Sequence, residues 1–296
     1  MKGIILAGGS GTRLRPLTGA LSKQMLPVYD KPMIYYPLSV LMLAGVREML
    51  LISTPSQLGM FEDLLGDGSR LGLTVEYAAQ DEPRGIAESL IIGADFIGDD
   101  QVCLVLGDNI FHGPRFSKLL GDSVANLDGC ELFGYRVSDP SRYAVGEIDD
   151  DARLLTLEEK PARPRSNLAV TGLYMYDSDV VGIAKNIAPS DRGELEITDV
   201  NRAYLAQGRA GLTELGRGFA WLDMGTPESL LNAGQYVQLL EQRQGERIAC
   251  IEEVALHKGF ITPQQCRRLG EEMAGTAYGA YVCAIAERPS PHTPAG

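Results

Sequence analysis

Short apolar runs alternate with helical patterns over the first third of the chain. The apolar runs predict buried strands at residues 4–7, 48–54, 74–78 and 102–106. The segments between them predict helices at residues 38–44, 60–65 and 86–93. Strands that alternate with helices at this spacing favour a mainly parallel central sheet wound by right-handed crossovers, with helices on both faces. We therefore expect an α/β fold of the Rossmann-like kind.

Strand-like runs follow one another in the middle of the chain. They lie at residues 131–135, 146–148, 154–158, 169–176 and 211–215. Helices are predicted near residues 179–187 and in a segment that ends at about Leu205. We expect the first four of these strands to form hairpins laid over the mouth of the sheet.

The C-terminal part of the chain reads as helical. Thr226 can cap, and Pro227 can begin, a long helix that ends before Gly245. Leu230, Ala233, Val237 and Leu240 form one apolar stripe on this helix, which needs a partner surface. We expect a core at residues 1–225, a helical region at 226–287 and a disordered tail at 288–296, rich in proline and poor in apolar groups.

The first predicted strand ends in a glycine-rich turn followed by cations. Gly8, Gly9 and Gly11 can bring the backbone close to a ligand, while Arg13 and Lys23 carry positive charge. This pattern indicates an anion-binding loop at the carboxyl end of the strand. It is not a P-loop, because no Gly-Lys-Ser/Thr occurs in the chain, and Leu14 stands where a dinucleotide fingerprint needs its third glycine.

Polar segments also follow two other strands of the predicted sheet. Residues 80–87 follow the third strand and residues 107–109 the fourth, so both should meet the glycine loop at one edge. Asp108 ends the strand at residues 102–106, and Asp223 follows the apolar residues 220–222. Two carboxylates with phosphate oxygens and waters would suit an octahedral Mg²⁺. Taken alone, each aspartate is more often a helix cap or a turn former than a metal ligand.

Composition narrows the range of partners. The formal net charge of the 296-residue chain is −12, which argues against a nucleic-acid backbone or an anionic membrane as the main partner. The five cysteines are dispersed and have neither zinc-site nor disulfide-framework spacing. No apolar stretch is long enough to cross a bilayer and no signal peptide is recognised, so we expect a cytoplasmic location.

The motifs resemble those of the sugar-1-phosphate nucleotidylyltransferases, and most closely the glucose-1-phosphate thymidylyltransferases. The resemblance covers residues 1 to about 286 and is carried by the segments 9–13, 22–27, 31–37, 64–68, 106–109, 158–161, 193–201 and 221–223. It implies transfer of a thymidylyl group from dTTP to glucose 1-phosphate, with Mg²⁺ as cofactor. It also implies β-hairpin insertions that bind the sugar, and a homotetramer formed through the C-terminal helices, with a regulatory nucleotide site.

The resemblance assigns roles residue by residue. The nucleotide would be bound by Leu6, Gly8, Gly9, Gly11, Thr12, Arg13, Gln80, Pro83 and Gly85. The sugar and its phosphate would be bound by Asn109, Ala144, Glu159, Lys160 and Val170. The catalytic residues would be Arg13, Lys23, Asp108 and Asp223, and the two aspartates would hold the metal. Glu194 and Glu196 look like ligands but can simply cap and anchor the helix that follows them.

Three positions depart from the family's usual motifs. Ala144 stands where a glycine normally approaches the sugar, unless Gly146 marks a local shift. Glu88 replaces a glutamine in the helix after the base-binding loop, and Met224 replaces a threonine after the second aspartate. A relative that uses UTP or an aminosugar 1-phosphate therefore stays open. A catalytically silent nucleotide-sugar sensor is the remaining alternative, although it should have lost some of the four catalytic residues.

Overall fold

A parallel four-stranded unit forms the centre of the molecule. The computed structural model describes residues 1–9 and 11–288. The unit has the order β6–β1–β4–β5, with β1 at Lys2–Leu6, β4 at Glu48–Ser53, β5 at Thr74–Ala79 and β6 at Val102–Leu106. All four strands agree with the sequence pattern to within a residue or two. The carboxyl ends of β1 and β6 are adjacent because Leu6 pairs with Leu106.

The strands of the middle segment extend this sheet instead of lying over its mouth, so the predicted position of the hairpins is wrong. These strands are β8 (Cys130–Arg136), β9 (Ala144–Ile148), β10 (Leu154–Glu159), β11 (Leu168–Tyr176) and β12 (Ala210–Glu214). β11 runs antiparallel to β6 and joins the two halves of a mixed sheet, which has nine strands in the described part of the chain. Every residue of β11 is buried, and this is why it can occupy the middle of the sheet.

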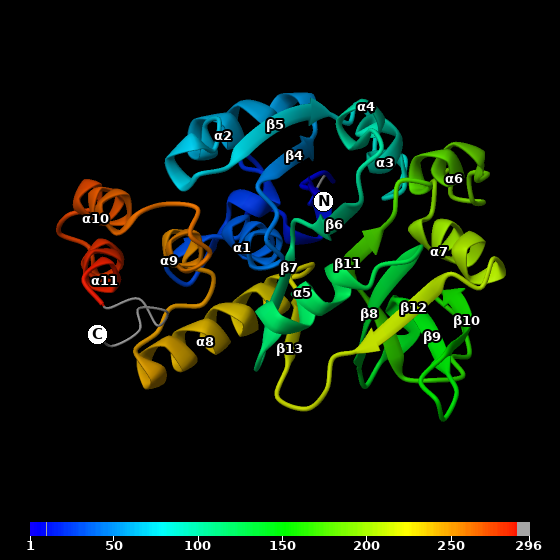
Figure 1. The fold of residues 1–296 in the computed structure, drawn as a ribbon. Helices are drawn as coiled ribbons and strands as arrows, with labels where there is room; N and C mark the ends of the chain where they lie inside the picture. Colours follow the sequence, from blue (N-terminus) through cyan, green and yellow to red (C-terminus); the bar gives the residue numbers. More distant parts are fainter. Residues whose placement is uncertain (10, 289–296) are drawn as a thin grey trace.

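Helices cover both faces of the sheet, as expected for the α/β class (Figure 1). Successive strand residues point to opposite faces, so Ile5 belongs to one apolar cluster and Ile4 to the other. The first cluster contains residues of α1 (Tyr35–Leu43), α2 (Pro55–Leu65) and α5 (Phe116–Ala125). The second contains residues of α3 (Glu88–Ile92), α4 (Ala94–Ile97), α6 (Val180–Asn186) and α7 (Ile197–Ala206).

The long C-terminal helix α8 (Pro227–Gln244) has the predicted ends. Thr226 accepts a hydrogen bond from the backbone of Ser229, and Gly245 ends the helix in the left-handed conformation at φ 72°. Its apolar stripe packs on the same chain, because Ala233 and Val237 share a cluster with Val28 of β2 (Pro27–Val28), which forms a short hairpin with β3 (Lys31–Pro32).

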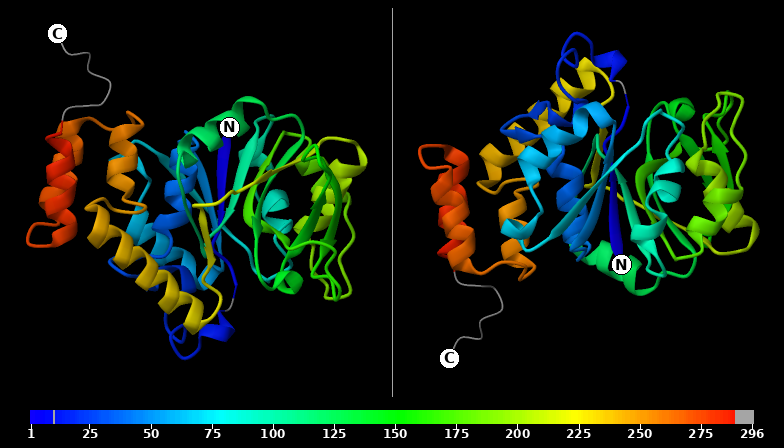
Figure 2. Two further views of the ribbon diagram at one scale, coloured as in Figure 1. Left: turned by 90° about the horizontal axis from the view of Figure 1, so that it is seen from below. Right: turned by 90° about the horizontal axis from the view of Figure 1, so that it is seen from above.

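Up to residue 288, three further helices follow α8 and lie at the end of the molecule farthest from β9 and β10 (Figure 2). They are α9 (Ile251–His257), α10 (Pro263–Glu272) and α11 (Ala277–Ala286). Of the predicted tail at 288–296, residues 289–296 lie outside the described part of the chain. The division into a core and a C-terminal region remains a prediction.

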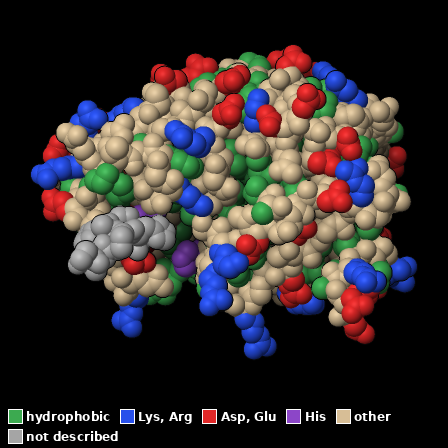
Figure 3. Space-filling view, in the orientation of Figure 1, with side chains coloured by type: hydrophobic (Ala, Val, Ile, Leu, Met, Phe, Trp, Pro, Cys, Tyr) green, Lys and Arg blue, Asp and Glu red, His purple; other side chains and the backbone are tan. Residues whose placement is uncertain are grey.

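Three general features complete the description of the fold. All five cysteines are free thiols, and four of them are buried. Acidic and basic side chains are interspersed over the face shown in Figure 3. Among the residues described, no helix combines the length and the apolar character needed to cross a membrane.

Candidate active site

A cavity of about 460 Å³ opens at the carboxyl ends of the parallel strands. It is lined by the predicted site residues Leu6, Gly8, Gly9, Arg13, Lys23, Gln80, Pro83, Gly85, Asp108, Asn109, Ala144, Glu159, Lys160, Val170 and Asp223. Two predicted residues, Gly11 and Thr12, do not line it. They form the start of a short 3-10 helix, where the carbonyl of Gly11 accepts a hydrogen bond of 2.8 Å from Thr18 Oγ1.

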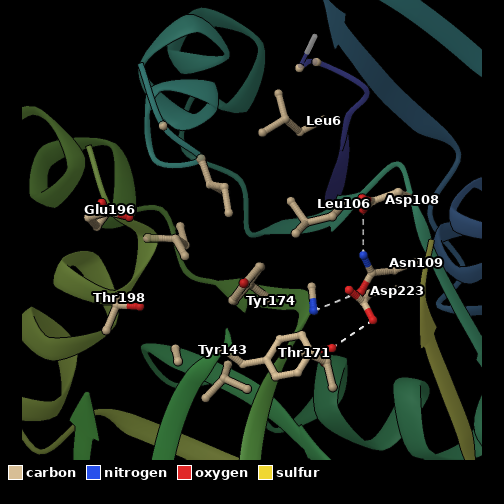
Figure 4. Close-up of a pocket in the computed structure, with 18 of the residues that line it drawn as sticks. Leu6, Leu106, Asp108, Asn109, Tyr143, Thr171, Tyr174, Glu196, Thr198 and Asp223 are labelled. Atoms are coloured by element: carbon tan, nitrogen blue, oxygen red, sulfur yellow. Dashed lines mark hydrogen bonds between the residues drawn. The ribbon is translucent and has the colours of Figure 1, made fainter. Parts of the chain in front are cut away.

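A small antiparallel ribbon brings the two aspartates together. It consists of β7 (Asn109–His112) and β13 (Ala220–Asp223), in which Asn109 is paired with Asp223. The backbone amide of Met224 donates a 3.0 Å hydrogen bond to the carbonyl of Asp108. Asp108, Asn109 and Asp223 therefore lie on one side of the cavity, across from Glu196 and Thr198 (Figure 4).

Asp108 lies half-buried against a cation. Its Oδ2 accepts a hydrogen bond from Lys23 Nζ, and its Oδ1 accepts one of 2.8 Å from Asn109 Nδ2. Burial acts to raise the pKa of Asp108, but the charge and hydrogen bond of Lys23 and the amide of Asn109 outweigh it, so the pKa lies below its ordinary value. Asp108 is therefore a carboxylate at neutral pH.

The segments that carry the cations contact the glycine loop and the turn after β13. Gln24 Nε2 donates a 3.3 Å hydrogen bond to the carbonyl of Gly8, which fixes the short 3-10 helix containing Lys23. The guanidinium of Arg13 lies against Gly225, because a Cβ added there would be 3.2 Å from Arg13 Nη2. Positive charge thus reaches the cavity beside both aspartates.

Asp223 is held by a tyrosine that the sequence did not single out as a ligand. Tyr143 OH donates a hydrogen bond of 2.8 Å to Asp223 Oδ1, and Arg142 Nη2 lies 3.7 Å from its Oδ2. Burial and the neighbouring Asp223 raise the pKa of Tyr143 to about 12. The phenol therefore stays protonated and remains a donor.

Gln80 lies beside the glycine loop, and the nitrogen end of its side-chain amide is held by hydrogen bonds. Its Nε2 donates to the carbonyl of Gly85 at 3.2 Å and to Glu88 Oε2 at 2.8 Å. Its Oε1 faces the glycine loop, since a Cβ added to Gly8 would lie 3.0 Å from it. A flat ligand that lay in the cavity beside Gly8 and Gln80 would meet a carbonyl acceptor.

The far side of the cavity is polar and charged. Glu159 Oε2 accepts a 2.6 Å hydrogen bond from Thr198 Oγ1, and its Oε1 lies 3.0 Å from Lys160 Nζ. Ala144 is paired with Glu159 in the β9–β10 ladder, and the irregularity of that ladder lies between Leu154 and Thr156. The ladder is thus regular from Ala144 to Gly146, and Ala144 lines the cavity.

Several residues that line the cavity were not among the predicted site residues. They are Gln24, Ile86, Leu106, Arg142, Tyr143, Thr171, Gly172, Tyr174, Glu194, Glu196, Ile197, Thr198 and Trp221. Glu196 precedes α7 but makes no side-chain cap; it accepts hydrogen bonds from Arg192 at 2.7 Å and Ser190 at 2.8 Å. The capping role considered for Glu196 is therefore wrong.

The donors at the aspartate side suit a hard divalent cation. Among the residues described, no three His, Cys, Asp or Glu side chains are grouped so as to hold a metal by themselves. Asp108 and Asp223 together offer carboxylate oxygens next to open cavity. This is the donor set expected for an ion that completes its shell with water and substrate phosphates, as Mg²⁺ does.

The fold and this cavity define a nucleotidyltransferase. The sequence model of the nucleotidyl transferase family matches residues 2–239, and the chain belongs to that family.

Within the family the chain is similar to enzymes named glucose-1-phosphate thymidylyltransferase. It is 52% identical to the one from Xanthomonas campestris pv. campestris, over 98% of this chain and 99% of that protein. It is 51% identical to the one from Mycobacterium tuberculosis, over 97% of this chain and 100% of that protein.

Two solved structures share the fold. A Bacillus anthracis protein assigned to the glucose-1-phosphate thymidylyltransferases has a TM-score of 0.74 and 38% identity, over 80% of this chain and 94% of that chain. A UDP-glucose pyrophosphorylase complexed with UDP-glucose has a TM-score of 0.70, over 80% of this chain and 98% of that chain. At 24% identity the second likeness concerns the fold alone.

Proposed function

We propose that this enzyme transfers the thymidylyl group of dTTP to α-D-glucose 1-phosphate, giving dTDP-α-D-glucose and pyrophosphate. The observation that carries the proposal is the meeting of Arg13, Lys23, Asp108 and Asp223 at one cavity on the carboxyl edge of the sheet. The relatives that match almost the whole chain carry the name of this activity. The product would enter deoxysugar synthesis.

The nucleotide is proposed to lie along the glycine loop. The base would lie against Gly8 and Gln80, with Leu6, Pro83 and Gly85 completing its pocket. The triphosphate would then run from Gly9 toward Arg13 and Lys23. Gly11 and Thr12, which the resemblance assigns to the nucleotide, would act through the shape of this loop, because neither lines the cavity.

The sugar phosphate is proposed to occupy the side formed by β9, β10 and β11. Asn109, Glu159 and the backbone at Val170 would contact the glucosyl hydroxyls, and Lys160 would meet the phosphate. Ala144 would bring a methyl group against the sugar. This placement sets the two phosphorus centres against each other between the cations and the aspartates.

The chemistry needs little proton transfer from the protein. The second pKa of a phosphomonoester is about 6, so the sugar phosphate is already a nucleophile at neutral pH. One of its oxygens attacks the α-phosphorus of dTTP in line, and the bond to the pyrophosphate oxygen breaks. Because two polyanions must approach, Arg13 and Lys23 would act by neutralising and aligning them.

Asp108 and Asp223 would hold the Mg²⁺ that this proposal includes. When bound, such an ion neutralises phosphate charge that develops in the transition state. The orientation of each aspartate is fixed by a hydrogen bond of 2.8 Å: Tyr143 donates to Asp223, and Asn109 donates to Asp108.

Pyrophosphate release tests the proposal. Purified protein with Mg²⁺ would be assayed with dTTP, UTP, ATP, CTP and GTP against the 1-phosphates of glucose, glucosamine, galactose and mannose. We expect the highest kcat/KM for dTTP with glucose 1-phosphate and measurable use of UTP, because one methyl group is worth only about 1–3 kcal/mol. A highest kcat/KM with another pair of substrates would support the type of reaction but assign a different substrate specificity. Binding without turnover would favour a sensor.

The C-terminal region is proposed to support a homotetramer and a regulatory nucleotide site. Leu231 and Leu239 on α8 are 61% and 62% exposed, which supports a subunit contact there. A second cavity of about 720 Å³ lies where α1, α5 and α9 meet, and the cations Lys258 and Arg288 line it. Light scattering would measure the mass of the oligomer, and inhibition by the product should weaken in Lys258→Gln.

We place the reaction in the cytoplasm, which the five free thiols support.

A further inference from the structure

Glu88 carries a charge at the base end of the cavity that the proposed reaction does not use. It is the first residue of α3, its side chain is only 16% exposed, and its Oε2 accepts the 2.8 Å hydrogen bond from Gln80 Nε2. Its other oxygen lies 3.7 Å from Arg84 Nη1. A carboxylate has no hydrogen to donate, so it dictates which end of the Gln80 amide faces it.

A second hydrogen-bond acceptor holds the Gln80 amide in the same orientation. Gln80 Nε2 also donates to the carbonyl of Gly85 at 3.2 Å. Backbone pairing on the far side of Gly85 limits how far that carbonyl can turn, because the amide of Ala87 donates a 3.2 Å hydrogen bond to the carbonyl of Leu195. The backbone is also fixed by the 2.7 Å hydrogen bond from Leu195 N to the carbonyl of Arg84.

The orientation of Gln80 decides what it can recognise. With Nε2 held between two acceptors, Oε1 is the atom that faces Gly8 and the open cavity. Thymine and uracil carry an N–H at position 3 and can donate to this oxygen, whereas cytosine carries a lone pair there. Turning the amide over would set Oε1 against the Glu88 carboxylate and the Gly85 carbonyl, which penalises cytosine by repulsion.

We propose that Glu88 is a positioning residue for base selection: it locks the Gln80 amide so that the cavity accepts pyrimidines protonated at N3 and rejects those that are not. This inference rests on the proposed function, because it takes Gln80 as the residue that reads the base. The reacting atoms lie elsewhere, near Asp108 and Lys23. Glu88 should therefore affect nucleotide binding and leave the chemical step unchanged.

The test compares two bases that differ only at positions 3 and 4, namely those of dTTP and 5-methyl-dCTP. Isothermal titration without sugar phosphate gives the ratio of their dissociation constants for wild type, Glu88→Gln, Glu88→Asp and Glu82→Gln. Glu82 lies in the same loop, is exposed, and pairs with Arg84 at 3.2 Å, so it is the matched control. Thermal unfolding verifies that each variant is folded.

We expect Glu88→Gln to lower the preference for dTTP about tenfold, because a neutral amide that can also turn its own N–H toward Gln80 replaces a charged acceptor. The carbonyl of Gly85 remains, so some preference should persist. Glu88→Asp, which keeps the charge, should retain most of the preference, and Glu82→Gln should retain all of it. In the pyrophosphate assay, kcat at saturating dTTP should stay within about twofold of wild type.

Two results would overturn the inference. One is an unchanged ratio in Glu88→Gln, and the other is an equal loss of affinity for both nucleotides, which a merely structural role would produce. If wild type bound dTTP but released no pyrophosphate, the proposed reaction would fail while the binding ratios still decided the role of Glu88.

Discussion

Trp221 Nε1 donates a hydrogen bond of 2.6 Å to Asn109 Oδ1, joining the two strands of the ribbon that carries the aspartates. The same oxygen accepts a longer bond of 3.3 Å from the backbone amide of Gly172. Because Oδ1 is occupied on that side, Nδ2 is directed to Asp108. The tryptophan therefore orients a residue to which we assign a sugar contact and, through it, an aspartate to which we assign the metal.

Trp221→Phe should disturb this orientation. The buried Asn109 oxygen would keep only the weaker bond, and an unsatisfied buried group costs about 1–3 kcal/mol. We expect kcat/KM for glucose 1-phosphate to fall roughly tenfold and the free energy of unfolding to drop by about 2 kcal/mol. Tyr135→Phe is the control, because Tyr135 stacks edge-on against Trp221 and bonds to the carbonyl of Phe219. It should cost stability alone; equal losses of kcat/KM in both variants would contradict the argument.

Gly8 is predicted to be required for close approach to the base. A methyl group at this position would stand 3.0 Å from Gln80 Oε1, and Gln80 cannot retreat without losing two hydrogen bonds. Gly8→Ala should therefore raise KM for dTTP about tenfold or more and leave KM for glucose 1-phosphate near wild type. Steady-state kinetics with each substrate varied in turn would measure this.

Gly59→Ala is the matched substitution for that experiment. Gly59 lies within α2, and nothing would come within 4 Å of an added Cβ. Alanine favours a helix over glycine by up to about 1 kcal/mol, so this variant should be neutral or slightly more stable. A normal KM for dTTP in Gly8→Ala would exclude the proposed position of the base.

The parallel half of the sheet could be predicted because its signal is local. Val102–Leu106 is an apolar run with a polar turn behind it, and the structure gives the strand those same bounds. The β7–β13 ribbon could not be found in this way. Each of its strands has four residues, and their pairing joins positions more than a hundred residues apart. The pattern of apolar residues within either segment does not indicate which strand it pairs with.

The site residues divide in the same way, into those with a local sequence signal and those placed by contacts between distant segments. The glycine loop and Asp108 were accessible because they end a recognisable strand, and the family motifs supplied Asp223. Tyr143 was not singled out, and Glu196 was recognised as a possible ligand without a role in the site. The place of both at the cavity depends on contacts made only after folding. Tyr143, the residue before β9, donates a hydrogen bond to Asp223. Glu196 accepts one from Arg192 in the turn before α7.

A pH-dependent stability is expected from Glu131 on β8. Thr213 Oγ1 donates a 2.6 Å hydrogen bond to Glu131 Oε1, but burial dominates and raises the pKa of this carboxyl above 4.5. A raised folded-state pKa means that the contribution to stability is complete below the unfolded-state pKa and is lost as pH rises through the folded-state pKa. At neutral pH the charged glutamate therefore weakens the fold.

Glu131→Gln should consequently be more stable than wild type at pH 7, and the difference should shrink as pH falls toward 4.5. Urea unfolding at a series of pH values would measure it. Glu76→Gln, an exposed position on β5, is the control and should stay close to wild type. A gain that did not depend on pH would mean that packing, and not the charge of Glu131, is responsible.

Asp108→Asn separates the catalytic role of this residue from its role in the fold. The amide keeps the size of the side chain but removes the charge that faces Lys23 and the proposed metal. Loss of one charged group that acts on the transition state costs about a hundredfold to a thousandfold in kcat. The fold should lose only roughly 1–3 kcal/mol, because the remaining contacts of β6 and β7 are unaffected.

Asp122→Asn serves as its counterpart, since it removes the exposed aspartate that pairs with Lys118 on α5 at 2.6 Å. It should change neither kcat nor stability by more than a small amount. Turnover would be measured over a range of Mg²⁺ concentrations, alongside thermal unfolding and dTTP binding. If Asp108→Asn turned over within about threefold of wild type at all Mg²⁺ concentrations, the metal would have to be held elsewhere. If it lost turnover only together with its fold, Asp108 would be structural, and the cations alone would have to align the two phosphates.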